Sequence, residues 1–77
     1  MTLQEIQTAI EEYGNNFVTI SLTENRNIRC ALRDAYPAYP NDPRGYTEPY
    51  FHVMRIDLER NPIEKYNCSE AIAITPL

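Results

Sequence analysis

The spacing of apolar residues predicts an amphipathic helix at the start of the chain. These residues recur at helical intervals, at Leu3, Ile6, Ile10 and Tyr13. Thr2 and Glu5 fit a capping box at the first turn, and Gly14 stands where a left-handed residue ends many helices. The pattern therefore predicts a helix over residues 3–13.

Further along, apolar and polar residues alternate, as they do in half-buried strands. The first apolar set is Val18, Ile20 and Leu22, and the second is Ile28, Cys30 and Leu32. Residues 24–27 separate the two runs and predict a turn. We therefore interpret residues 17–33 as a β-hairpin.

Residues 50–58 predict a third strand and residues 71–75 a closing one. In the third strand we expect Met54, Ile56 and Leu58 on the core side and Phe51, Val53, Arg55 and Asp57 on the other. Residues 61–64 read Asn-Pro-Ile-Glu, which is typical of the first turn of a helix and predicts a single helical turn there.

These elements predict an α+β protein with a single small domain over residues 1–77. One N-terminal helix packs on a four-stranded antiparallel sheet, and a long Tyr/Pro-rich loop, residues 34–50, joins strands 2 and 3. A chain of 77 residues has room for one core. Its 43% apolar and 23% charged residues are typical of globular proteins.

Charge is distributed unevenly along the chain, which has a net charge of −4. Residues 1–25 contain four glutamates and no lysine or arginine, and the whole chain has one lysine. This argues against direct binding to nucleic acid or to an anionic membrane. It favours a protein partner with a basic or groove-like surface. Without a long apolar run or a signal peptide, we expect a soluble, cytoplasmic protein with free thiols.

Few residues offer chemistry for catalysis. The chain has one histidine, His52, and two cysteines, Cys30 and Cys68, so a nucleophilic pair would come from these three residues. We expect His52 and Cys30 on the core side of their strands, and a small-ligand or enzymatic role for them is an alternative. The spacing of these residues fits no metal site, and we expect no cofactor.

The Tyr/Pro-rich loop is the main candidate for a binding site, because it holds four of the six prolines and four of the six tyrosines. Tyr-Pro repeats at an interval of three, which in polyproline II geometry would align the rings of Tyr36 and Tyr39. Residues 41–45 predict a turn. Tyrosine is enriched at interface hot spots. The residues expected to contact a partner are Tyr36, Tyr39, Asp42, Arg44 and Tyr46; alternatively, the rings fold back to cap the core.

The acidic side of the helix is a second candidate surface, with Glu5, Glu11 and Glu12. Such a row of carboxylates would suit a basic protein partner, including one that handles nucleic acid.

The composition and the absence of a catalytic motif favour a non-enzymatic protein-binding module. One form is a small acidic inhibitor of a larger, nucleic-acid-handling host complex. No motif of the chain aligns with a known family; size and charge alone offer an analogy with phage-encoded inhibitors of host machinery, including anti-CRISPR proteins. The alternative is a self-associating structural subunit that forms a homo-oligomer through its open sheet face or a strand edge.

Overall fold

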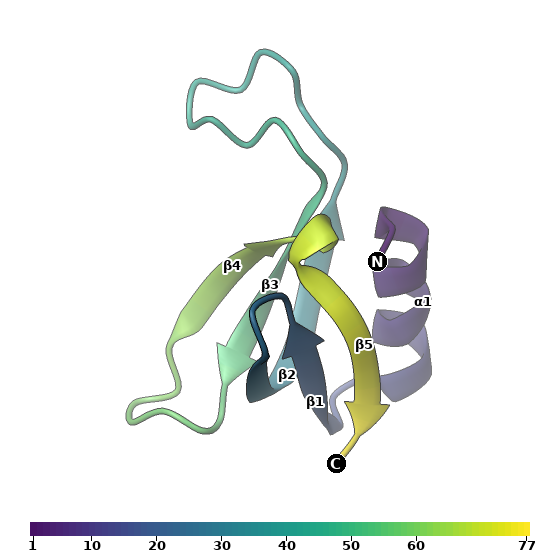
Figure 1. The fold of residues 1–77 in the computed structure, drawn as a ribbon, viewed down its shortest axis with the longest axis vertical. Coiled ribbons are helices and arrows are strands. Elements are labelled where there is room, and N and C mark those ends of the chain that lie inside the picture. Colours follow the sequence, from purple (N-terminus) through teal and green to yellow (C-terminus); the bar gives the residue numbers. More distant parts are fainter.

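The computed structural model describes all 77 residues and contains a helix packed on a five-stranded antiparallel sheet (Figure 1). Its elements are α1 (Leu3–Tyr13), β1 (Phe17–Leu22), β2 (Arg26–Tyr36), β3 (Tyr50–Arg55), β4 (Ile63–Asn67), the short 3₁₀ helix η1 (Cys68–Glu70) and β5 (Ala71–Pro76). The order β4-β3-β2-β1-β5 makes β4 and β5 the edge strands. The α+β prediction is confirmed. The four-stranded sheet is wrong, because β4 begins within the predicted helical turn.

Helix α1 begins and ends as its sequence predicts. The Thr2 hydroxyl accepts a hydrogen bond from the Glu5 amide, and the Glu5 carboxylate accepts one from the Thr2 amide. Gly14, with φ of 54°, ends the helix and donates its amide to the Ile10 carbonyl. Neither α1 nor η1 is long and apolar enough to cross a membrane.

The core lies between α1 and one face of the sheet. Its central side chains are Ile6, Ala9, Val18, Ile20, Leu22, Ile28, Cys30, Leu32, Phe51 and Val53. The core residues predicted on β1 and β2 are confirmed. Those predicted on β3 are wrong, because Phe51 and Val53 are fully buried whereas Met54 is only half-buried. Leu58 is exposed and lies beyond the last residue of β3.

The same face of the sheet is polar where it reaches β4. The Arg55 guanidinium contacts Asp57 at 2.6 Å and Glu64 at 2.8 Å, and the Tyr66 hydroxyl donates to Glu64 at 2.6 Å. The hydrogen bonds from Arg55 lower the pKa of Asp57 to about 2. Helix α1 packs across β2, and this end of the face is covered by the ion pairs of Arg55 together with the Tyr66 ring, which packs against the core beside Phe51.

Candidate binding surfaces

The structure narrows the Tyr/Pro-rich loop to residues 37–49, because Tyr36 and Tyr50 pair with each other at the ends of β2 and β3. The loop extends beyond the sheet along the long axis of the molecule, which measures 35 Å (Figure 1). The Tyr39 amide donates to the Tyr46 carbonyl at 3.3 Å, which joins the outgoing and returning arms.

Two consecutive turns shape the tip of the loop. The Asp42 amide donates to the Tyr39 carbonyl, and the Gly45 amide donates to the Asp42 carbonyl, each at 3.0 Å. Proline is the second residue of both turns, where its fixed φ suits a β-turn. Gly45 has φ of 84°, which favours glycine at this position. The turn predicted over residues 41–45 corresponds to the second of these two turns, residues 42–45.

The buried carboxylate of Asp42 accepts three hydrogen bonds at the tip of the loop. Its carboxylate accepts the Arg44 amide at 2.8 Å and two guanidinium nitrogens at 3.0 and 2.9 Å. Asp42 is only 8% exposed, whereas the Arg44 side chain is 63% exposed. The side-chain hydrogen bonds from Arg44 lower the pKa of Asp42. Asp42 therefore holds Arg44 in place at the surface.

An aromatic cluster, composed of Tyr36, Tyr46, Tyr50 and His52, joins the base of the loop to the outer face of the sheet. The ring centre of Tyr50 lies 4.8 Å from that of Tyr46, 5.3 Å from that of Tyr36 and 5.6 Å from that of His52. Tyr50 is 6% exposed and forms the centre of the cluster. These rings pack against one another on the face opposite the core.

Two cations and a carboxylate complete the cluster. The Lys65 ammonium lies 4.4 Å and the Arg44 guanidinium carbon 4.7 Å from the ring centre of Tyr46, which places both in cation–π range. His52 Nδ1 lies 2.7 Å from Asp34 Oδ1. The Asp34 charge raises the pKa of the Tyr36 hydroxyl. These contacts tie the returning arm of the loop to β3 and β4.

His52 and Cys30 lie on opposite faces of the sheet, so the expectation that both face the core is wrong. Cys30 is fully buried, and burial is the main factor that raises its pKa to about 12. His52 pairs across the strands with Asp34, on the outer face. The error has a structural origin, since the core face of β3 carries Phe51 and Val53 and therefore places His52 outside. This arrangement provides no cysteine–histidine pair.

The structure brings the predicted loop residues together, with the backbone of Tyr39 bonded to Asp42 and Tyr46, but the Tyr39 ring lies outside the aromatic cluster. Tyr39 is 64% exposed, and Tyr36 is 42% exposed at the end of β2. The predicted polyproline II alignment of these two rings is wrong, because Tyr36 belongs to a strand. Sequence reasoning missed Lys65, since β4 was not recognised, and the place of Tyr50, since the two faces of β3 were assigned the wrong way round.

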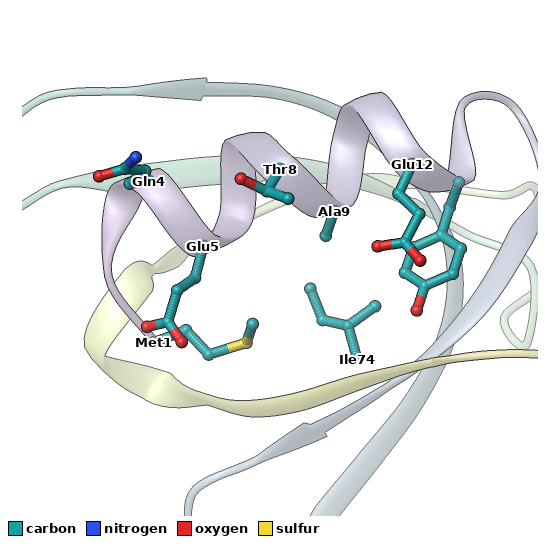
Figure 2. A pocket seen from close by; sticks show the side chains of 8 residues that line it. Met1, Gln4, Glu5, Thr8, Ala9, Glu12 and Ile74 are labelled. Carbon is teal, nitrogen blue, oxygen red and sulfur yellow. The ribbon is translucent and has the colours of Figure 1, made fainter.

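The predicted acidic surface lies elsewhere, on α1. Glu5, Glu11 and Glu12 are all exposed, and hydrogen bonds with Thr2 lower the pKa of Glu5. Glu5 and Glu12 line a groove of about 430 Å³ between α1 and β5, the helix groove, with Ala9 and Ile74 between them (Figure 2). Glu11 does not line it, and neither does any residue of the Tyr/Pro-rich loop.

The two candidate surfaces thus differ in position and chemistry. The loop presents aromatic and cationic side chains, and the helix groove presents carboxylates around an apolar floor. Neither surface contains a group of three or more histidine, cysteine, aspartate or glutamate residues that could hold a metal ion. Comparison of the chain with protein families, with curated proteins and with solved structures finds no match.

Proposed function

We propose that this chain is a non-enzymatic protein-binding module that docks through its Tyr/Pro-rich loop. The observation that carries the proposal is the combination of internal order and exposure. Asp42 and Tyr46 are held by contacts within the protein, while Tyr39 and the Arg44 side chain remain exposed at the far end.

Internal order favours binding because a loop that is already ordered loses less conformational entropy when it meets a partner. Each rotamer-rich side chain fixed at an interface costs about 0.5–1.5 kcal/mol. The contacts of Asp42 with the amide and guanidinium of Arg44 remove part of that loss before association. A projecting loop of this kind fits a concave surface on a larger protein.

Exposed side chains define the chemistry of the contact. Tyr36 and Tyr39 offer large, stiff rings with a hydroxyl group, and Arg44 offers a guanidinium group. Tyrosine and arginine are enriched at interface hot spots. The partner surface should therefore be a groove with apolar walls and a carboxylate or carbonyl group near Arg44. In this proposal Asp42 and Tyr46 position the loop and do not make the main contacts.

An inhibitor is the form of this function that we favour. A small protein that inserts a stiff loop into a groove of a larger, nucleic-acid-handling host complex would block that groove without any chemistry of its own. The size and negative charge of the chain support this form.

The test is affinity capture of the partner, followed by measurement of its dissociation constant with purified proteins. We expect Tyr36→Ala/Tyr39→Ala to weaken binding by roughly thirtyfold or more, as the loss of a hot spot does. Phe17→Ala is the matched control, because Phe17 is an aromatic residue on β1 that is 49% exposed. Equal affinity of the double variant and the control, with the fold of both intact by circular dichroism, would refute the proposal.

A further inference from the structure

The helix groove is an open surface with an apolar floor and acidic ends. Figure 2 shows the Glu5 and Glu12 side chains at its two ends, with Ala9 and Ile74 between them. Both carboxylates point toward β5, the edge strand of the sheet. None of the ion pairs of the protein involves a glutamate of α1.

The charge around the groove is negative and uncompensated by lysine or arginine. The last turn of α1 contains Glu11 and Glu12 but no basic residue. Carboxylates at this position also face the negative end of the helix dipole, which disfavours them. The Met1 ammonium, near the Glu5 end, is already bonded to the Cys68 and Ala71 carbonyls. A cationic ligand would therefore relieve an unfavourable charge at the Glu12 end, whereas at the other end the exposed Glu5 carboxylate is bonded to the Thr2 amide.

We infer that the helix groove binds an extended basic segment of a partner protein, in which an apolar residue stands midway between two arginine or lysine residues. This goes beyond the proposed function of the loop and does not depend on it. The cationic side chains pair with Glu5 and Glu12, and the apolar side chain packs on Ala9 and Ile74.

The spacing of the two glutamates sets the spacing of the cations. Glu12 stands seven positions after Glu5 on the helix, which corresponds to a rise of about 10.5 Å. In an extended peptide, residues i, i+2 and i+4 share one face and span about 13 Å. A helix rises about 1.5 Å per residue and an extended peptide about 3.3 Å, so the two spans differ by roughly 2.5 Å. The flexible side chains of arginine and lysine accommodate this difference. The predicted pattern is basic, any, apolar, any, basic.

The position of the helix groove beside an edge strand favours a ligand with an extended backbone. The groove runs beside β5, which pairs only with β1, so no strand occupies its outer edge; the Ala71 carbonyl at the start of β5 accepts the Met1 ammonium. Extended peptides commonly bind by adding a strand to such an edge. A peptide beside β5 would lie where the α1 carboxylates can reach its side chains.

The test uses synthetic peptides and nuclear magnetic resonance of the labelled full chain. The probe carries arginine, leucine and arginine at alternate positions between glycines, and the matched peptide carries glutamate in place of both arginines. We expect the peptide with two arginines, and not the peptide with two glutamates, to change the chemical shifts of the backbone amides of Glu5, Ala9, Glu12 and Ile74. Equal shifts with the acidic peptide, or shifts confined to the Tyr/Pro-rich loop, would overturn the inference.

Variants of the chain complete the experiment. Glu5→Gln/Glu12→Gln should weaken binding about tenfold, since it removes two ion pairs while glutamine preserves the capping box. Glu24→Gln/Glu59→Gln removes two exposed acids outside the groove and should change affinity less than about twofold. Equal weakening by the two pairs of substitutions would overturn the inference. So would self-association without peptide that Glu5→Gln/Glu12→Gln abolishes, because the groove would then belong to a second copy.

Discussion

The Tyr/Pro-rich loop and the helix groove use their polar side chains in opposite ways. In the loop, Asp42 is bonded to Arg44, and Tyr46 lies within cation–π range of Lys65. In the groove, Glu12 has no cationic partner and stands at the unfavourable end of the helix dipole. The loop is thus held by internal contacts, whereas the groove retains unpaired charge.

This difference separates residues that support the fold from residues that are available to a ligand. Substitution of Tyr46 or Tyr50 in the aromatic cluster should destabilise the protein, because these rings contact each other and Tyr46 faces the cations of Arg44 and Lys65. Substitution of Glu11 or Glu12, in the last turn of α1, should leave stability unchanged or raise it. Proteins commonly give up some stability where function requires it, which is the trade-off that the groove would represent.

The largest effect is expected from Tyr50→Ala. Tyr50 is almost fully buried at the centre of the aromatic cluster, and truncation of a large buried aromatic residue lowers the free energy of unfolding by about 3 kcal/mol. Urea denaturation measures the change. Tyr39→Ala is the control, since this ring is 64% exposed and its loss should change stability by less than about 0.5 kcal/mol. Equal effects of the two variants would contradict the assigned roles.

The next effect is a loss of order in the Tyr/Pro-rich loop at low pH. Arg44 holds the pKa of Asp42 below its ordinary value of 3.8, so the carboxylate stabilises the loop fully above that pH. This contribution is lost as the pH falls through the lowered pKa. We expect the protection factor of the Gly45 amide, which is its intrinsic exchange rate at the given pH divided by the measured rate, to fall in acid more than that of the Val53 amide. In Asp42→Asn the Gly45 amide should already exchange fast at neutral pH; unchanged exchange there would exclude this role for Asp42.

A smaller loss of stability is expected from Lys65→Met. Methionine keeps most of the apolar stem of the side chain but removes the charge that faces Tyr46 and Tyr50, which is worth about 0.5–1 kcal/mol, and with it the hydrogen bond of the ammonium to Asn67. Thermal or urea unfolding measures the loss. Arg29→Met serves as the control, because the Arg29 side chain is exposed and takes part in no ion pair. If Arg29→Met lost the same stability, the contact of Lys65 with the tyrosine rings would not be what stabilises the protein.

The smallest effect has the opposite sign. Glu12→Gln removes a negative charge from the last turn of α1 and should raise the free energy of unfolding by about 0.3–1 kcal/mol at low salt. The gain should shrink as salt screens the dipole. A loss of stability would mean that Glu12 is already paired in solution, and the groove would then have no free charge at that end.

Sequence predicted those parts of the fold that local rules determine. The capping box of Thr2 and Glu5, and the apolar stripes of β1 and β2, each indicate one structure. Strand β3 was ambiguous because it carries apolar residues on both faces, and only the packing of α1 selects Phe51 and Val53.

Strand β4 was missed for a physical reason. Its inner residues, Glu64 and Tyr66, meet Arg55 and not the apolar face of α1, so the strand has no apolar alternation. The preceding residues Arg60 and Asn61 have positive φ angles of 69° and 47°, which no helical first turn allows. Without β4, neither Lys65 nor its contact with Tyr46 could be predicted, although the loop itself was found from its composition.

The central claim is that the Tyr/Pro-rich loop is ordered in the free protein, and the heteronuclear nuclear Overhauser effect of its backbone amides tests this most directly. We predict that the values for Tyr39, Asp42, Arg44 and Gly45 match those of strand β3. Values in this loop as low as those of a freely moving chain end would contradict the claim, because the loop would then become ordered only on binding.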